Sequence, residues 1–159
     1  MSEIVVVPFA TALAPAFRQL NLDWIERLFR VEPPDRKVLD DPEHAIIVPG
    51  GQIFFALDGE SAVGTVAMIH CGSGRYELAK MAVVSSHQHR GIGERLGAAG
   101  IAWACRNGAT SVFLETNSRL AGAIRLYERL GFCHAVDPSP TEYARADVYM
   151  ELPISRNGA

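Results

Sequence analysis

The sequence contains no apolar run long enough to cross a membrane and no start typical of a secretory signal. The first nine residues include an apolar stretch, but no basic region precedes it and no small-residue cleavage site follows. No later stretch approaches the roughly 18 uninterrupted apolar residues that a transmembrane helix needs. We therefore expect a soluble cytoplasmic protein without a membrane partner.

Basic charge is also scarce. The chain has 15 Lys and Arg against 18 Asp and Glu, which gives a formal net charge of -3. This balance argues against a broad basic surface that holds a nucleic-acid backbone by releasing counterions. No nucleic-acid partner is expected.

Cysteines are few and widely separated. Cys71, Cys105 and Cys133 are odd in number and lack the spacing of a metal site or a disulfide framework. We expect them to be buried thiols in a reducing compartment. His87 and His89 flank one loop without a third ligand nearby, so no metal is assigned to them.

What the chain does have is the composition of an ordinary globular protein. Its 159 residues are 48% hydrophobic and 21% charged, and we find no internal repeat, linker or low-complexity segment. Both length and composition predict a single domain over residues 1–159.

The apolar pattern predicts strands separated by helices. Strands are expected at 4–7, 52–57, 62–71, 76–84, 111–115, 132–136 and 147–152, and helices at 12–29, 91–106 and 120–130. Four prolines in the acidic segment 31–51 predict a long, semi-ordered connection there. The order of these strands and helices along the chain predicts an α/β (α+β) fold with a mixed sheet flanked by helices. The earlier strands are expected to be antiparallel, and a βαβ crossover follows later.

The most informative string, Gln88-His89-Arg90-Gly91-Ile92-Gly93, joins the 76–84 strand to the 91–106 helix. Its glycines let backbone N–H groups approach an anion, and the helix start adds unpaired donors, so a pyrophosphate would fit. A glycine-rich turn without a ligand is the alternative. The string is neither a P-loop, which ends in Gly-Lys-Ser/Thr, nor a Rossmann fingerprint, because Gly97 comes one position too late.

This string matches the Gln/Arg-x-x-Gly-x-Gly/Ala motif of the GNAT superfamily of N-acetyltransferases. Segments 77–83, 115–117 and 123–132 resemble the same family. The resemblance spans residues 53–152, is most specific between 77 and 132, and is that of a small prokaryotic member. It implies the GNAT fold, a mixed and mostly antiparallel sheet of about seven strands that splays between the fourth and fifth, with a bulge in the strand that ends at Val84.

The resemblance also implies acetyl-CoA as co-substrate, with its pyrophosphate held on backbone amides. The Met81 N–H would polarise the thioester carbonyl, and the Val83 amide would pair with the pantetheine arm. The expected cofactor contacts are Met81, Ala82, Val83, Gln88, His89, Arg90, Gly91, Ile92, Gly93, Glu94, Asn117, Ala123 and Tyr127.

Two side chains are candidates for moving protons. Tyr127 lies where the family commonly places a hydroxyl beside the CoA sulfur, which makes it the expected general acid; a core tyrosine is the alternative. Glu77 lies eleven positions before Gln88, the spacing of the general-base glutamate in the histone-modifying branch. A carboxylate needs burial or a water relay for that role, and a solvated strand residue is the alternative.

Two expectations follow for the surroundings of these residues. Alternation along the strand places Glu77 with Ala79, Met81 and Val83, and turns Lys80 to the opposite face. Asn117 is expected either to hydrogen-bond CoA or the catalytic water, or to cap the helix that follows.

The sequence gives little information on the amine that accepts the acetyl group. Acidic residues in 31–43 could attract a cationic amine, or could simply be solvated. The expected function is acetyl transfer to an amine of a small molecule or peptide by direct attack in a ternary complex. A non-catalytic acyl-CoA sensor and an unrelated nucleotide-phosphate binder are the alternatives, and a homodimer is a possible assembly.

Overall fold

The computed structural model describes residues 3–155. Its strands are β1 (Ile4–Pro8), β2 (Gln52–Asp58), β3 (Ser61–His70), β4 (Arg75–Val83), β5 (Ser111–Thr116), β6 (Cys133–His134) and β7 (Val148–Pro153). Its α-helices are α1 (Ala14–Leu28), α2 (Pro33–Leu39), α3 (Ile92–Arg106) and α4 (Ala121–Arg129), joined by short helical turns at Thr11–Leu13, Glu43–Ile47 and Ser85–His87.

The seven strands form one mixed sheet in the order β1-β2-β3-β4-β5-β7-β6. Only β4 and β5 run parallel, and the α3 crossover joins them. All other neighbours are antiparallel. The predicted mixed, mostly antiparallel sheet is confirmed.

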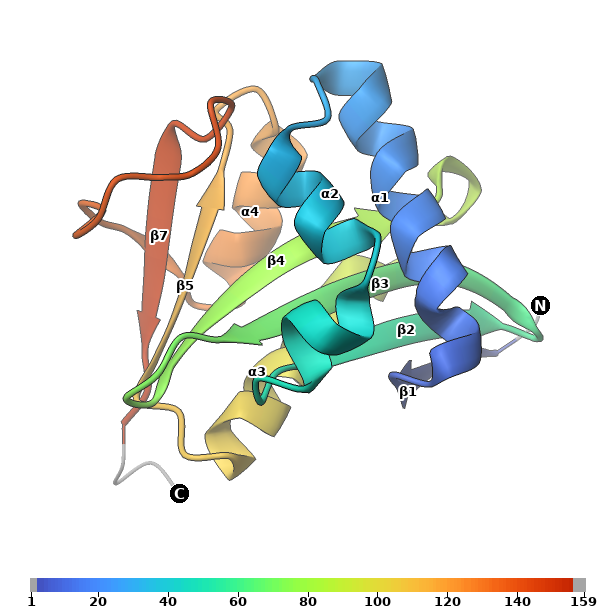
Figure 1. Ribbon diagram of the computed structural model, residues 1–159, viewed down its shortest axis with the longest axis horizontal. Coiled ribbons are helices and arrows are strands. Elements are labelled where there is room, and N and C mark those ends of the chain that lie inside the picture. Colours follow the sequence, from blue (N-terminus) through green and yellow to red (C-terminus); the bar gives the residue numbers. More distant parts are fainter. Residues whose placement is uncertain (1–2, 156–159) are drawn as a thin grey trace.

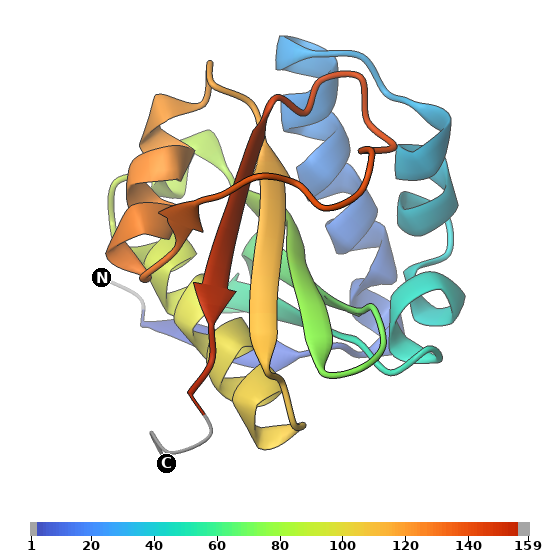
Figure 2. The same ribbon diagram turned by 90° about the vertical axis from the view of Figure 1, so that its left-hand side faces the viewer.

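Helices cover both faces of the sheet. In Figures 1 and 2, α1 and α2 lie on one face and α3 and α4 on the other. Each face buries its own apolar cluster. The α1 face is centred on Phe17, Ile25, Leu39, Ile46 and Phe55, and the α3 face on Val66, Met68, Leu78, Leu96 and Leu114. Full burial of one such side chain is worth about 1.5–3 kcal/mol, so both clusters hold the helices to the sheet.

The connection between α1 and β2 is more regular than expected. Short elements occur there, as predicted, but α2 has a capping box in which the Asp35 carboxylate accepts a hydrogen bond from the Glu32 N–H at 2.9 Å. Leu39 and Ile46 are buried in the α1-face cluster. Capping and burial together order this segment, so the prediction of a semi-ordered connection was wrong.

Two smaller expectations also need correction. Cys71, Cys105 and Cys133 are exposed, not buried. They fall just after β3, on the outer side of α3 and on the edge strand β6. Strand β6 has two residues instead of the five predicted, because only Cys133 and His134 pair with β7. Within residues 3–155, no helix is long and apolar enough to cross a membrane.

Strands β4 and β5 separate along their length, as Figure 1 shows. Their pairing is confined to the beginning of β4 and ends at Glu77 opposite Phe113. Beyond that point β4 continues to Val83 without β5 beside it. The predicted splay between the fourth and fifth strands is confirmed, and it leaves unpaired backbone along one edge of β4.

Candidate active site

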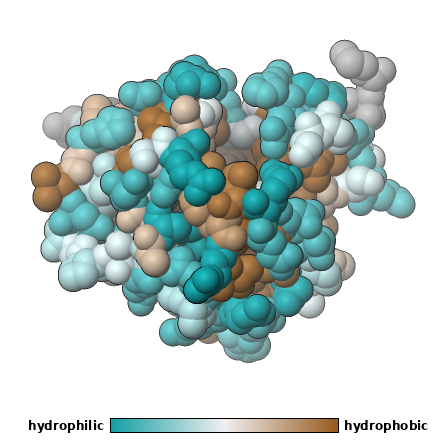
Figure 3. Space-filling model, turned by 90° about the horizontal axis from the view of Figure 1, so that it is seen from above, coloured by the Kyte–Doolittle hydropathy of each residue, from teal (hydrophilic) through white to brown (hydrophobic). Residues whose placement is uncertain are grey.

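A cavity of about 710 Å³ opens where β4 and β5 separate. Its walls come from the end of α1, from β4, from the loop before α3, from the end of β5, from α4 and from the segment before β7. Seen from above in Figure 3, apolar atoms line a hollow between two polar ridges. Of the predicted site residues, all except Arg90 line this cavity.

The loop before α3 has the geometry of an anion cradle. Gly91, the residue before α3, has a φ of 77°, and a Cβ added there would meet open space. The first N–H groups of a helix have no acceptor within it, and no side chain caps those of α3. The Gln88 side chain donates to the Val83 carbonyl at 3.0 Å and ties the loop to β4. These features fit a pyrophosphate.

A bulge interrupts β4 above the cavity. Ala79 pairs with Ala67 and Ala82 with Thr65, so β4 has two residues, Lys80 and Met81, where β3 has one. Lys80 adopts a φ of 56°, a left-handed conformation that costs a residue other than glycine about 1–3 kcal/mol.

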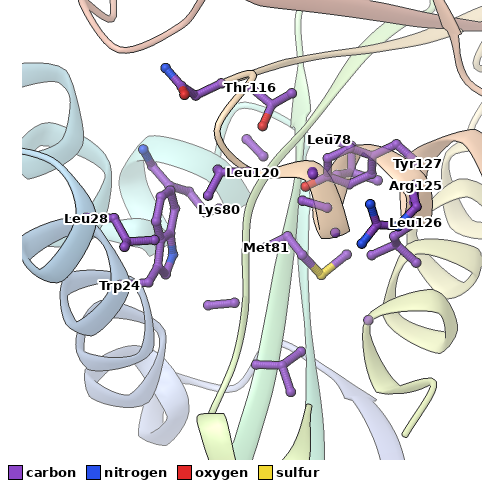
Figure 4. Close-up of a pocket in the computed structure, with 18 of the residues that line it drawn as sticks. Trp24, Leu28, Leu78, Lys80, Met81, Thr116, Leu120, Arg125, Leu126 and Tyr127 are labelled. Carbon is purple, nitrogen blue, oxygen red and sulfur yellow. The ribbon is translucent and has the colours of Figure 1, made fainter. Parts of the chain in front are cut away.

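The bulge also reverses the alternation expected from the sequence. Glu77 pairs with Ile69, which packs on the α1 face. Lys80 reaches Asp35 of α2 and so lies on this same face. Met81 packs instead against the α3-face cluster. Figure 4 shows Lys80 on the side of Trp24 and Leu28, and Met81 directed to the opposite side, toward Leu126. The expectation that Lys80 faces away from Glu77 was wrong, because alternation fails at a bulge.

Glu77 has an unusual electrostatic environment. Burial, helped by the negative charge of Glu115, raises the pKa of its carboxyl group to about 7 against the opposing positive charge of Lys80. A carboxyl group with a pKa near neutrality can accept a proton without holding it permanently. The burial that a basic glutamate needs is therefore present.

Tyr127 lies on the other side of the cavity, on α4. Its ring is buried and packs edge-on against Phe132, with the ring centres 6.1 Å apart. Burial alone raises the pKa of its hydroxyl to about 12. No hydrogen bond from this hydroxyl to another residue in 3–155 is found, which leaves it free for a molecule in the cavity.

The wall on the α1 side was not predicted from the sequence. It includes Trp24, Phe29, Tyr143 and Arg145, from segments far apart in the chain. The Trp24 ring N–H donates to the buried Asn21 side chain at 3.1 Å, which fixes the ring. Trp24, Tyr143 and Arg145 belong to none of the motifs from which the site residues were predicted.

The acidic residues of 31–43 make contacts within the chain and not with the cavity. Glu32 and Asp35 bind Arg145, and Asp40 binds Arg18. Asp41 binds His44, and Glu43 accepts from Thr11. None of these carboxylates lines the cavity. The carboxylates that do line it are Glu77, Glu94 and Glu115.

Asn117 lines the cavity without capping a helix. Its side-chain amide donates to the Arg145 carbonyl at 2.6 Å and accepts from the Arg119 N–H at 2.8 Å. Helix α4 begins four residues later with no side-chain cap, so Asn117 caps the turn at 118–120 and not the helix itself. Asn117 instead joins the end of β5 to the segment before β7.

Comparison with known proteins places this architecture among acetyltransferases. N-alpha-acetyltransferase 30 of Schizosaccharomyces pombe is 34% identical over 84 residues, which make up 50% of this chain and 56% of that protein. N-acetyltransferase 8B of rat is 34% identical over 88 residues, 52% of this chain and 40% of that protein. The chain thus spans about half the length of these relatives.

Solved structures show the same fold over nearly the whole chain. A GNAT-family acetyltransferase of Staphylococcus aureus Mu50 superposes with a TM-score of 0.87 at 18% identity, covering 96% of this chain and 100% of that one. YncA of Salmonella typhimurium, solved with its cofactor acetyl-CoA, gives a TM-score of 0.78 at 20% identity, covering 98% and 96%.

The model of the acetyltransferase (GNAT) family matches residues 16–132, which is well over half of the chain. This stretch contains the splayed strands, the bulge and the glycine loop that the resemblance rested on. The chain belongs to the acetyltransferase (GNAT) family.

Proposed function

We propose that this protein transfers the acetyl group of acetyl-CoA to an amine of a small molecule or peptide, by direct attack in a ternary complex. The observation that carries the proposal is that Glu77, the β4 bulge at Met81 and Tyr127 line one cavity together with the glycine loop before α3. Acetyl-CoA would enter along the unpaired edge of β4, with its pyrophosphate on the loop that contains Gly91 and Gly93. The amine would enter on the side of Trp24 and Tyr143.

In this scheme the amine nitrogen attacks the thioester carbonyl carbon, and the C–N bond forms as the C–S bond breaks. Glu77 takes the proton of the amine, directly or through a water molecule. The Met81 N–H donates to the carbonyl oxygen as it becomes negative, which is the stabilisation that an oxyanion hole provides.

Tyr127 would assist the leaving sulfur mainly as a hydrogen-bond donor. A hydroxyl with a pKa of about 12 is a weaker acid than a thiol, whose pKa is about 8.5. Full proton transfer to the thiolate is therefore uphill, whereas a hydrogen bond to the developing charge is favourable. This refines the general-acid role expected from the sequence.

The proposal is tested by incubating the protein with acetyl-CoA and a panel of amines that includes polyamines, amino acids and a lysine peptide, and by following release of free thiol. We expect release that depends on at least one amine, with the acetylated amine found by mass spectrometry. Binding of CoA with no turnover above hydrolysis across the panel would favour the acyl-CoA sensor instead.

The cradle itself makes a separate prediction. Gly91→Ala is expected to weaken acetyl-CoA binding about tenfold or more, because the added Cβ stands in the open space before α3 where the phosphates would lie and because φ of 77° disfavours alanine. Isothermal titration with acetyl-CoA measures the change.

Gly72→Ala is the matched control for that variant. Gly72 has a φ of 86°, and a Cβ there also meets open space, but the residue lies in the β3–β4 turn and does not line the cavity. The control should have a similar backbone strain and keep its affinity for acetyl-CoA. Equal loss in both variants would show that backbone strain, and not the site, is responsible.

A further inference from the structure

Lys80 occupies a backbone conformation that its residue type does not favour. Three residues other than glycine have positive φ within residues 3–155. Ser73 and His89 lie in loops, where such values are common, but Lys80 lies inside strand β4. Lysine gains nothing locally from this conformation, unlike glycine or asparagine. A contact elsewhere must therefore hold it.

The contact is a buried ion pair. The Lys80 Nζ donates to Asp35 Oδ1 at 2.6 Å and to the Tyr143 hydroxyl at 3.2 Å. The side chains of Lys80 and Asp35 are 5% and 0% exposed. Burial favours the neutral form of Lys80 and lowers its pKa, and the bond to Asp35 counteracts that effect.

Asp35 is itself firmly anchored. Besides Lys80, it accepts hydrogen bonds from the Glu32 N–H at 2.9 Å and from both terminal nitrogens of Arg145, at 2.8 and 2.5 Å. Burial would raise the pKa of Asp35, but the bonds from Arg145 and Lys80 prevail and lower it to about 2. The anchor thus joins α2 to the segment before β7 and stays ionised.

Met81 is the residue that directly follows Lys80. Its amide plane is set by the same backbone torsions that the ion pair restrains, and Figure 4 shows the two side chains leaving the bulge in opposite directions. Buried ion pairs are seldom more stabilising than apolar packing, but they can select one conformation among several. A backbone donor is effective only when it is already aimed at the developing charge.

We propose that Lys80 is a positioning residue, whose ion pair with Asp35 fixes the bulge of β4 and thereby the direction of the Met81 N–H. This inference rests on the proposed role of that amide in polarising the thioester carbonyl. Lys80 acts through the backbone and need not touch the acetyl group.

The test compares wild type with Lys80→Gly. Glycine adopts the positive φ freely, so the variant can still form the bulge. Because it has no side chain to bind Asp35, nothing holds the bulge in that one conformation. The readout is the infrared stretching band of the thioester carbonyl in bound acetyl-CoA, isotope-labelled at that carbon. Hydrogen bonding lowers this frequency. We expect a lowered frequency in wild type and its partial return toward the free value in the variant.

Kinetics should change in parallel. We expect kcat of Lys80→Gly to fall about tenfold, while KM for acetyl-CoA changes less than about twofold, because the pyrophosphate and pantetheine contacts remain. A distortion of the whole cavity would instead raise KM for acetyl-CoA, and a loss of folded protein would lower the melting temperature. Asp35→Asn, which weakens the same ion pair from its other end, should reproduce the infrared change and decides the question if Lys80→Gly does not fold.

Arg18→Met is the control for removal of an ion pair. Arg18 binds Asp40 at 2.9 Å on the surface, and neither residue lines the cavity. This variant should keep both the infrared band and kcat of wild type.

A wild-type carbonyl frequency that does not fall on binding would overturn the role of the Met81 amide and this inference with it. A lowered frequency that persists in Lys80→Gly would overturn only the positioning role.

Discussion

Tyr127→Phe is expected to lower kcat about 100-fold while leaving KM for acetyl-CoA nearly unchanged, because the lost hydrogen bond forms only as the sulfur becomes negative. The variant should fold normally. The hydroxyl makes no hydrogen bond within residues 3–155 that its removal would break, and the ring keeps its contact with Phe132. The measurement is thiol release at saturating acetyl-CoA and amine, together with a thermal melt.

Tyr76→Phe provides the matched control. Tyr76 is also buried, and its hydroxyl donates to the Asn107 carbonyl at 3.4 Å, away from the cavity. We expect kcat to be unchanged in this variant. A Tyr127→Phe enzyme that turns over at the wild-type rate would remove the hydroxyl from the reaction and reduce Tyr127 to a packing residue.

Local signals in the sequence were sufficient to locate most of the fold. Asp58-Gly59 separates the strands expected at 52–57 and 62–71, which form the β2–β3 hairpin, and Asn107-Gly108 follows the helix expected at 91–106, which ends at Arg106 as α3. Both signals act within a few residues, where turn chemistry and helix termination are decided. The family motifs then supplied the splay, which no periodicity reveals.

What the sequence did not reveal depends on distant partners. The family resemblance implied a bulge in this strand but not its position at Lys80, and the contact that holds it there reaches Asp35, 45 positions earlier. Arg145 lies 110 positions from the same carboxylate. Acidic residues that looked available for a substrate were therefore already bound, which only the folded chain discloses. The glycine loop of the cavity follows from a local motif, and the wall that contains Trp24, Tyr143 and Arg145 from tertiary contacts.

Glu77→Gln is expected to change the pH dependence of the reaction as well as its rate. With a pKa of about 7, Glu77 becomes an effective base only as the pH rises through neutrality. We expect wild-type kcat to rise about tenfold per unit below this value and to level off above it. The glutamine variant should lose this limb and run at least about 100-fold slower on the plateau.

Glu115→Gln is the informative companion variant. The negative charge of Glu115 contributes to the raised pKa of Glu77, so its removal should move the acidic limb toward lower pH without abolishing it. Profiles of kcat at saturating substrates, taken between about pH 5 and pH 9, measure both effects. An acidic limb that survives unchanged in Glu77→Gln would exclude Glu77 as the titrating base.

The same pKa has a consequence for folding. Because the folded protein raises the pKa of Glu77 from 4.5 to about 7, the folded state binds the proton more tightly than the unfolded state. Wild type therefore loses stability as the pH rises from about 4.5 to 7, by up to roughly 3 kcal/mol.

Glu77→Gln should not show this loss and should have the higher free energy of unfolding at about pH 8, with little difference at about pH 4. Urea unfolding at the two pH values measures it, and equal stabilities at the higher pH would show that the fold does not penalise the charged carboxylate. An inactive but more stable variant is what we expect of a carboxylate kept in an unfavourable environment for its chemistry.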